Sequence, residues 1–286
     1  MTLGDLRFLA LGVLLFGFAW PVTKDALRDA TPVWFGTGRA GFAALTVAAV
    51  LLALRRLRWP GRADWPAVIA VGTMQLGIFF GLTHVAIGYL PAGRTAILSN
   101  VTIMWLVPLS VLFLGERVSP TRWAAAGLGL LGALVLVGPW ALDWSRREIV
   151  VAHLLLMAAA LSWSFAILAT RRFPPGRPML ELMPFCFGIA TLLLLPLALI
   201  REPAGGIGPS AWPHMAFIGL IAAPLGTWGV IEAGRRLPST VASVGFLIAP
   251  VLGVAAGALW LGETIGWDVW TGGALVLGSV ILAVRG

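Results

Sequence analysis

The chain has 286 residues, of which 59% are apolar and only 11% are Asp, Glu, Lys or Arg, and its formal net charge is +8. A soluble domain would have about a quarter of its residues charged, so the composition excludes a soluble globular protein. The apolar residues form long blocks and the basic residues lie at the block ends, which is typical of a membrane protein and does not indicate nucleic-acid binding.

Ten apolar stretches follow one another along the chain, joined by short connections that leave no room for a soluble domain. Each is ~18–23 residues long, enough for a helix to cross ~30 Å of hydrocarbon. Because a helix satisfies its own backbone hydrogen bonds, we predict an all-α integral membrane protein. The predicted transmembrane helices are 6–26, 33–54, 65–87, 92–114, 121–138, 150–170, 179–200, 212–234, 239–261 and 267–284.

The first half places its candidate substrate-binding residues well inside predicted helices. They are Phe16 and Trp20 in 6–26, Gln75, Phe79 and His84 in 65–87, and Asn100 in 92–114. The rings either pack in the bundle or against lipid, or they line a cavity in which flat solutes stack and organic cations are attracted. The polar groups either bind a substrate's amino or carboxylate group or bond to other helices. Arg39 either meets an anionic group or snorkels to an interface.

The second half offers two more candidates, Trp163 in 150–170 and Trp228 in 212–234. Glu232 follows in the same helix, and we interpret it as the partner of Arg235 or Arg236 in an ion pair. Glu116 and Glu263 each follow a glycine at a predicted helix end, so we expect them to satisfy the donors that open the next helix. The single cysteine, Cys186, lies in an apolar span and has no second cysteine to pair with.

The sequence matches itself at a constant offset of 147 residues. Trp65-Pro66 aligns with Trp212-Pro213, Gly115-Glu116 with Gly262-Glu263, Trp123 with Trp270, and Phe16 with Trp163. Five helices per half is an odd number, so the second half enters the membrane in the opposite sense. We therefore predict two inverted five-helix repeats, 1–139 and 148–286, with a substrate site between them and alternating access, as in secondary transporters.

Three segments resemble a known repeat. Phe16-Gly17-Phe18-Ala19-Trp20-Pro21-Val22-Thr23-Lys24 is similar to the opening of the EamA repeat, and Leu114-Gly115-Glu116 and Leu261-Gly262-Glu263 resemble the Leu-Gly-Glu that ends its fourth helix. Phe16 departs from the pattern, in which Trp is usual. The resemblance is to the ten-helix exporters of the drug/metabolite transporter superfamily, and within it to the YddG-type exporters of aromatic amino acids. It implies export of amino acids, metabolites or cationic toxicants.

Several functions are disfavoured by what the sequence lacks. There is no Walker A motif, and the only lysine is Lys24, so we expect no ATPase subunit and no ATP hydrolysis. The three histidines are scattered and match no metal motif, so we expect no metal and no cofactor. No catalytic constellation is evident, which argues against an enzyme. The expected partners are a small-molecule substrate and the lipid bilayer, and the oligomeric state stays open.

The charges also predict the orientation. With the amino terminus in the cytoplasm, thirteen basic residues lie in inside segments and six in outside loops, which predicts an inner (plasma) membrane protein with both termini cytoplasmic. The predicted function is export of small amphipathic metabolites, with aromatic and other neutral amino acids as leading substrates. The alternatives are efflux of cationic lipophilic toxicants or, in a different class, an intramembrane enzyme or a receptor, and the lack of extramembrane domains argues against the receptor.

Overall fold

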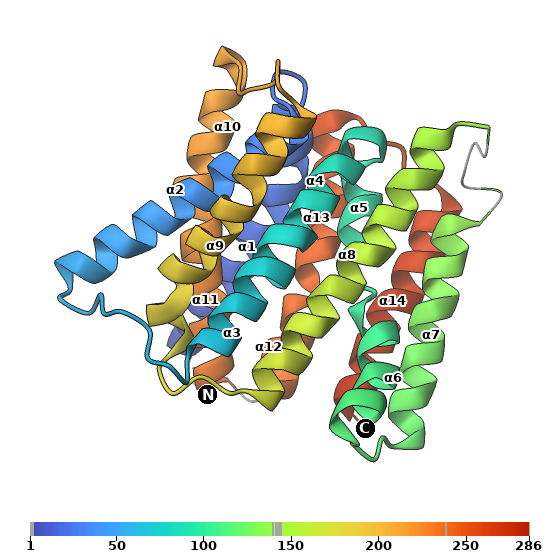
Figure 1. Cartoon of the computed structure of the whole chain (residues 1–286). Helices are drawn as coiled ribbons and strands as arrows, with labels where there is room; N and C mark the ends of the chain where they lie inside the picture. The colour runs from blue at the N-terminus through green and yellow to red at the C-terminus, as the bar shows by residue number, and fades with distance from the viewer. Residues whose placement is uncertain (1–2, 139, 141–144, 238, 286) are drawn as a thin grey trace.

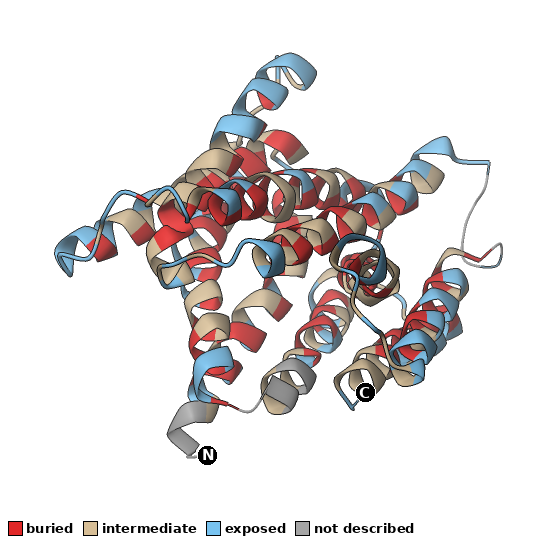
Figure 2. Ribbon diagram, turned by 60° about the horizontal axis from the view of Figure 1, so that its bottom comes forward, coloured by how far each residue is buried: buried red, intermediate tan, exposed pale blue. Residues whose placement is uncertain are grey.

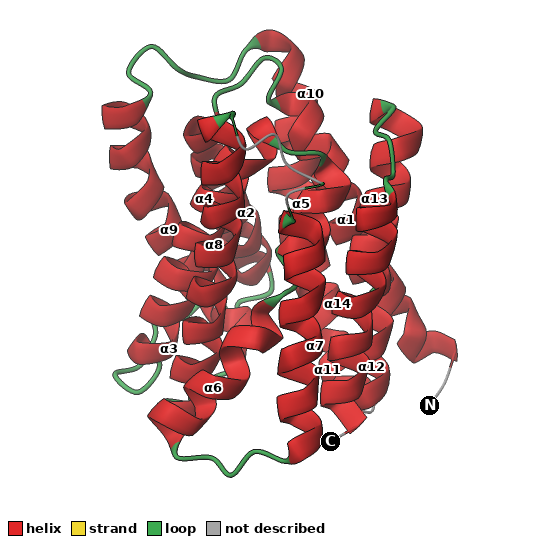
Figure 3. Cartoon of the chain, turned by 90° about the vertical axis from the view of Figure 1, so that its right-hand side faces the viewer, coloured by secondary structure: helices red, strands yellow, loops and turns green. Residues whose placement is uncertain are grey.

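The computed structural model describes residues 3–138, 140, 145–237 and 239–285, and within it the backbone alone of residues 3–5, 239, 240, 243 and 244. Helices account for all regular structure in this described part apart from one isolated bridge between Ala30 and Ile207 (Figures 1 and 3). The prediction of an all-α protein is therefore confirmed. In the described part of the chain, nine helical segments are long and apolar enough to span a membrane.

The first half contains five membrane-crossing units. The first two and the last are single helices: α1 (Leu3–Ala26), α2 (Pro32–Ala53) and α7 (Pro120–Val137). The third unit joins α3 (Trp65–Ala70), the π-helix η1 (Val71–Ile78) and α4 (Phe79–Tyr89). The fourth unit is broken into α5 (Ala92–Leu98) and α6 (Thr102–Leu114).

The second half repeats this plan. Its single helices are α8 (Arg147–Arg172), α9 (Met179–Arg201) and α14 (Trp267–Arg285). Its third unit joins η2 (Pro209–Ala211), α10 (Trp212–Ala216), the π-helix η3 (Phe217–Ala222) and α11 (Ala223–Arg236). Its fourth unit is broken into α12 (Ser239–Phe246) and α13 (Ile248–Leu261). The predicted span 239–261 is therefore two helices, neither of which alone crosses a bilayer.

The breaks in the two fourth units occur at equivalent positions. Asn100 follows α5, Leu247 separates α12 from α13, and the two residues are 147 positions apart. Pro250 has no N–H for the carbonyl of Phe246, which helps to end α12 there. In the first half, the side chains of Ser99 and Asn100 donate to the carbonyls of Thr95 and Ala96, and such local bonds compete with the helical ladder.

The two halves run through the bundle in opposite directions. We call the side that carries the start of α1 and the end of α14 the terminal face, at the bottom of Figure 1, and the other side the opposite face. α1 starts at the terminal face, whereas α8 starts at the opposite face (Figure 1). The loops 54–64, 115–119 and 173–178 lie at the terminal face, and 27–31, 202–208 and 262–266 at the opposite face.

α7 and α14 pack along each other at one edge of the bundle (Figure 1). Glycines make this close approach possible: a Cβ atom on Gly132 would lie 2.9 Å from the carbonyl oxygen of Gly272. Both helices contact α5 and α6 but are distant from α2 and α9, which pair on the other side of the bundle. The fifth helix of each half thus lies away from the helices that carry most of the candidate site residues.

Buried residues occupy the helix faces that look into the bundle, and exposed residues lie on outward faces and at the ends (Figure 2). The outward faces are apolar, and Leu259 on α13 has 89% of its surface exposed. A soluble monomer would not expose so many leucines and isoleucines in contiguous patches. These faces are suited to lipid contact, as expected for a multi-pass membrane protein.

At the terminal face, loops from both halves are joined through Asp64. Its carboxylate accepts from the backbone N–H of Gly176 at 2.9 Å and of Arg177 at 3.2 Å, and from Gly61 in its own loop. Burial alone would raise the pKa of Asp64, but these N–H groups and the Arg177 charge outweigh it, and the pKa lies below its ordinary value. Arg56 also pairs with Glu181 across the halves at 3.1 Å.

Candidate functional site

Three aromatic rings from α4 and α8 meet inside the bundle and form what we call the Trp163 cluster: Phe79, Phe80 and Trp163. The ring centroids of Phe79 and Trp163 are 4.6 Å apart, those of Phe79 and Phe80 5.0 Å, and all three pairs meet edge to face. Phe79 is 4% exposed and Trp163 is half-buried. Next to Trp163, the Ser162 hydroxyl donates to the Met74 carbonyl at 2.8 Å and fixes α8 against η1.

Two nitrogen-bearing side chains flank this cluster. The guanidinium carbon of Arg39, on α2, lies 3.7 Å from the centroid of the Phe80 ring. The His84 ring, one turn beyond Phe80 on α4, lies 6.0 Å from that ring, and its Nδ1 is hydrogen-bonded to the Phe80 carbonyl. Both side chains are buried. The structure thus combines a fixed cation, an imidazole and three aromatic rings at one place inside the membrane-spanning bundle.

A second aromatic cluster lies between α1, α11 and α12, and we call it the Phe16 cluster. Phe16 meets Phe246 edge to face at 6.0 Å, and Trp228 meets Phe8 edge to face at 5.3 Å. These residues belong to one hydrophobic cluster with Val13 and other apolar side chains. Among the described residues no ring contact joins the Phe16 cluster to the Trp163 cluster.

The repeat explains why two clusters exist. Trp163 is equivalent to Phe16, and Phe79 is equivalent to Gly226, at the 147-residue offset. In the structure the Phe16 ring lies against Gly226, where an added Cβ would be 3.2 Å from it, just as the Trp163 ring lies against Phe79. The first helix of each half therefore meets the third unit of the other half, and the contact of α8 with α4 is more aromatic than that of α1 with α11.

The remaining predicted residues make no ring contact with either cluster among the described residues. Trp20, on α1, is half-buried and lies against Gly253 of α13. Gln75 is half-buried on η1, one turn before Phe79, and has no hydrogen bond among the described residues. Asn100 lies in the break between α5 and α6, and its amide donates to the Ala96 carbonyl at 2.8 Å. The structure therefore brings Phe79, His84 and Trp163 together, and separately Phe16 and Trp228.

At the opposite face the two halves are joined by bonds to helix ends. The Glu263 carboxylate accepts from the backbone N–H of Ala92 at 2.6 Å and of Gly93 at 3.1 Å, at the start of α5. The expectation that Glu263 serves the helix that follows it is wrong, because its partners belong to the other half. Within the first half, the Lys24 ammonium donates to the carbonyls of Ile87 and Gly88, at the end of α4, at 2.7 and 3.1 Å.

At the terminal face the equivalent residues behave differently. Glu116, the equivalent of Glu263, pairs with Arg171, the equivalent of Lys24, at 3.7 Å. Among the described residues Glu116 makes no bond to α12, which is the equivalent of α5. α5 packs against α13, whereas α6 and α12 form no extended contact in the described part of the chain and lie apart in Figures 1 and 3. In the described part of the chain the two fourth units therefore pack together at the opposite face and not at the terminal face, where the halves meet through other contacts such as α6 with α8.

The ion pair predicted for Glu232 is confirmed. The Glu232 carboxylate accepts from Arg235 at 2.8 Å and from Arg236 at 3.0 Å, on the same helix. Glu232 is therefore neutralised locally at the end of α11, and its partner Arg236 lies over the Phe8 ring.

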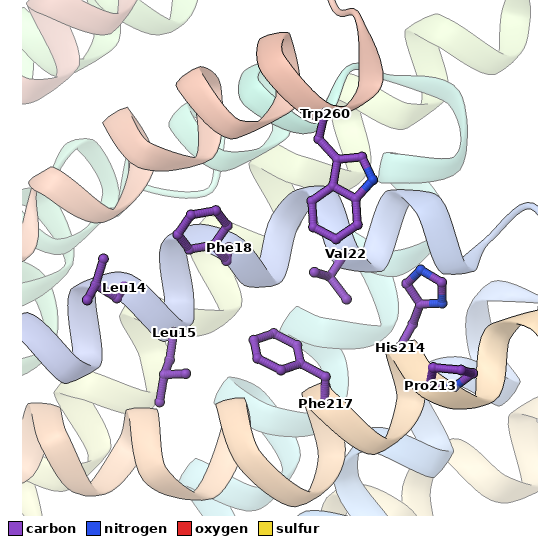
Figure 4. Close-up of a pocket in the computed structure, with 8 residues that line it drawn as sticks. All are labelled: Leu14, Leu15, Phe18, Val22, Pro213, His214, Phe217 and Trp260. Atoms are coloured by element: carbon purple, nitrogen blue, oxygen red, sulfur yellow. The ribbon is translucent and has the colours of Figure 1, made fainter.

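A groove of about 490 Å³ opens toward the lipid-facing surface between α1, α13 and the α10–η3 segment (Figure 4). Phe217 and Trp260 point into it from either side of Val22 (Figure 4). Its other lining residues are Leu14, Leu15, Phe18, Pro213 and His214. None of the eight predicted site residues lines it. Its exposed Leu14, Phe18 and Trp260 give it the character of an interhelical groove that lipid chains can enter.

Sequence reasoning missed three features of the site. The π-helices η1 and η3 lie at equivalent places in the two halves, and such segments are frequent at functional sites, but no local composition marks them. The helix breaks at Asn100 and Leu247 were not predicted either. Arg39 was considered only by itself, and its place over Phe80 depends on how α2 crosses α4.

The model of the EamA-like transporter family matches residues 4–138 and again residues 150–285. A solved crystal structure is similar over 98% of this chain and 97% of that chain, with a TM-score of 0.66 and 22% sequence identity, which shows a shared fold.

Three curated relatives are similar over nearly the full length. A probable terminal-alkyne amino-acid exporter of Streptantibioticus cattleyicolor is 26% identical, over 97% of this chain and 92% of its own. A probable amino-acid metabolite efflux pump of Salmonella typhimurium is 25% identical, over 98% and 94%. A riboflavin transporter of Rhizobium johnstonii is 26% identical, over 100% and 89%.

No group of three or more metal-ligating side chains occurs among the residues that the structure describes. The relatives are named as transporters, exporters or an efflux pump, not as enzymes. Because the family model covers both halves of the apolar, helical bundle, the chain belongs to the EamA-like transporter family and is a multi-pass membrane transporter.

Proposed function

We propose that this transporter exports small amphipathic metabolites, with aromatic and other neutral amino acids as its main substrates. The observation that carries the proposal is the Trp163 cluster, in which three rings from two helices meet inside the bundle. A half-buried indole at such a place offers a flat apolar surface on which an aromatic side chain can stack. Two relatives named for amino-acid or amino-acid-metabolite export give independent support.

Alternating access between the repeats 1–139 and 148–286 is the proposed mechanism. The outermost residues of these ranges and residue 139 lie outside the described residues. Support comes from the unequal contacts at the two faces: Glu263 binds the start of α5, while the equivalent Glu116 does not bind α12. If each half can adopt the other's arrangement, the protein has two conformations of similar free energy. One is closed at the opposite face and the other at the terminal face. Substrate would then reach the site from one face at a time.

Efflux of cationic lipophilic toxicants is the weaker proposal. Arg39 places a permanent positive charge 3.7 Å from the Phe80 ring centroid, next to the Trp163 cluster. A cationic solute at this cluster would be repelled by that charge, and the face of Phe80 is already taken by a cation. A neutral amino acid, which carries a carboxylate, does not suffer this repulsion.

The proposed location is the inner (plasma) membrane, with the terminal face in the cytoplasm. In a Cys186→Ala background, which lacks the native thiol, Ala204→Cys should react with an impermeant maleimide in intact cells. Arg58→Cys should react only after the cells are permeabilised, because basic residues concentrate at the terminal face. Both positions are exposed, so reactivity reports sidedness. Labelling of both residues from the same side would contradict the inverted arrangement. If Arg58→Cys reacts in intact cells and Ala204→Cys only after permeabilisation, the terminal face lies outside the cell.

Replacing Trp163 by Ala tests the proposed substrate class. Loss of a stacking wall should cost ~1 kcal/mol of substrate binding, or about fivefold in affinity, for phenylalanine. Alanine, which has no ring to stack, should lose much less. The measurement is liposome uptake of labelled phenylalanine and alanine, normalised to inserted protein.

Phe16→Ala provides the matched control, since it removes the equivalent ring in the other half. A tryptophan with a purely structural role would lower the amount of folded protein, at a typical cost of ~3–5 kcal/mol of stability, without changing the ratio of the two fluxes. An unchanged phenylalanine-to-alanine ratio in Trp163→Ala would therefore contradict the proposed role of the Trp163 cluster.

A further inference from the structure

Arg39 is a buried arginine without an acidic partner. It is 6% exposed, and it forms no hydrogen bond or ion pair among the residues that the structure describes. Its place is seven residues from the start of α2 at Pro32, or about 10 Å along the helix, which is inside the hydrocarbon depth. Charged side chains at such depth are costly, and they usually face the bundle interior and pair with another charge or with a ligand.

The side chain faces the interior and not the lipid. Phe35, one turn earlier on α2, is fully buried against Ala19 and Val22 of α1, and its ring lies 5.8 Å from that of His84. The guanidinium itself lies over Phe80 of α4. Arg39 therefore projects toward α4, beside the Trp163 cluster. The snorkelling alternative considered for Arg39 does not fit, because a snorkelling head group would be exposed.

Nearby groups do not neutralise the charge. The Phe80 ring attracts the guanidinium but accepts no hydrogen bond in its plane, and the Nε atom of Arg39 is buried without a partner. The Nε2 atom of His84 is also buried without a partner. Every carboxylate whose side chain is described lies in a loop or near a helix end, where most are bound to other residues. The surroundings of Arg39 thus leave its guanidinium donors without acceptors and contain no anion among the described residues.

The repeat argues against a purely structural role. The equivalent of Arg39 in the second half is Cys186, which is buried on α9, and the equivalent of His84 is Ile231. The same fold therefore packs this position with a small side chain and no charge. Gln75 and Asn100 likewise correspond to Ala222 and Leu247. The polar residues considered for substrate binding come from the first half alone.

We propose that Arg39 binds the carboxylate of the transported solute, while Phe79 and Trp163 contact its aromatic side chain. This inference rests on the proposed export of aromatic amino acids and names the group that recognises them. A guanidinium offers a planar pair of donors that matches the two oxygens of a carboxylate, and the Phe80 ring holds that plane in place. Because His84 Nδ1–H donates to the Phe80 carbonyl, Nε2 of the neutral ring is an acceptor, and the donors for the carboxylate come from Arg39.

The test compares solutes within each protein, so that the result does not depend on how much protein folds. Labelled phenylalanine uptake into liposomes is competed with unlabelled phenylalanine, phenylalaninamide and 3-phenylpropionate. In the wild-type protein, phenylalanine and 3-phenylpropionate should compete at least tenfold better than phenylalaninamide, which has no carboxylate. In Arg39→Gln this preference should fall to about equal, while Arg39→Lys, which keeps the charge, should retain part of it.

Arg56→Gln, at an exposed arginine of the terminal face, is the control and should keep the wild-type preference. A wild-type protein in which the amide competes as well as phenylalanine overturns the inference, and so does an Arg39→Gln protein that keeps the preference. If Arg39→Gln is too unstable for uptake, the loss of part of the preference in Arg39→Lys decides the question. Absence of phenylalanine uptake in the wild-type protein would overturn the proposed function itself. The 3-phenylpropionate arm separates amino acids from plain carboxylic acids as the source of the anion.

Discussion

Replacing Asp268 by Asn should lower the free energy of unfolding by about 3 kcal/mol, because it leaves a buried charge without its partner. Asp268 opens α14 and pairs with Arg94 of α5, and both side chains are nearly buried, at 9% and 11% exposure. Arg94 also donates to the Leu136 carbonyl at 3.0 Å, so it cannot turn to solvent without losing a second bond. The pair joins the two halves at the opposite face.

The measurement is reversible unfolding in mixed micelles with increasing denaturing detergent. Arg56→Gln is the matched control: Arg56 also pairs across the halves, with Glu181, but is 61% exposed, and its loss should cost less than ~1 kcal/mol. The double replacement Arg94→Met with Asp268→Leu should recover most of the stability, since apolar residues of similar size often replace buried pairs without loss. Equal effects of Asp268→Asn and Arg56→Gln would show that the burial of the Arg94–Asp268 pair has no energetic consequence.

The transmembrane helices were predictable because hydropathy alone reports them. Eight predicted spans correspond to continuous helical segments of the described residues whose ends differ from the prediction by a few residues. The other two were wrong as continuous helices, since 92–114 breaks at Asn100 and 239–261 breaks at Leu247. Pro250 is a visible signal for the break at Leu247, but the equivalent break at Asn100 has no proline one turn later. It depends on side-chain bonds to helical carbonyls, which many serines and asparagines could make without breaking a helix.

The repeat could also be recognised in the sequence, and it explains why both Leu-Gly-Glu segments contain a glycine. Gly115 and Gly262 end α6 and α13 with φ of +63° and +69°, a left-handed conformation that glycine adopts without strain. The glutamate that follows was harder to interpret. Its position suggested a local cap, whereas Glu263 binds Gly93, 170 residues away in sequence. A sequence pattern identifies a capping residue but not which of several helix ends it reaches.

The sequence predicts how deep in the membrane each candidate site residue lies, but it does not predict which of these residues are in contact. Phe79 and Trp163 were selected because they lie mid-span, and they do meet. Phe16 and Trp228 were selected for the same reason and instead belong to another cluster. Which faces of two helices touch depends on crossing geometry, which a single sequence does not report. Their roles in binding therefore remain predictions that the uptake experiments address.

Replacing Glu263 by Gln should open the opposite face, because the structure closes that face with two charge-assisted bonds to the start of α5. Glutamine keeps one acceptor oxygen without the charge, so the closed arrangement should lose roughly 2 kcal/mol, or about thirtyfold in the ratio of closed to open protein. A Val254→Cys reporter in the Cys186→Ala background measures this. Val254 on α13 faces Gly93 of α5, so it is shielded while the face is closed. Its reaction with a water-soluble maleimide should become faster in Glu263→Gln.

Glu116→Gln is the matched control, since Glu116 is the repeat equivalent of Glu263. It binds only Arg171 among the described residues, at 3.7 Å, with both side chains substantially exposed, so its loss should cost less than ~1 kcal/mol in the present arrangement. In the alternate arrangement, Glu116 would take the role that Glu263 has now. Glu116→Gln should therefore leave the labelling of Val254→Cys unchanged or make it slower. Equal acceleration by both replacements would mean that the contacts at the two faces are not exchanged during transport, and would contradict alternating access.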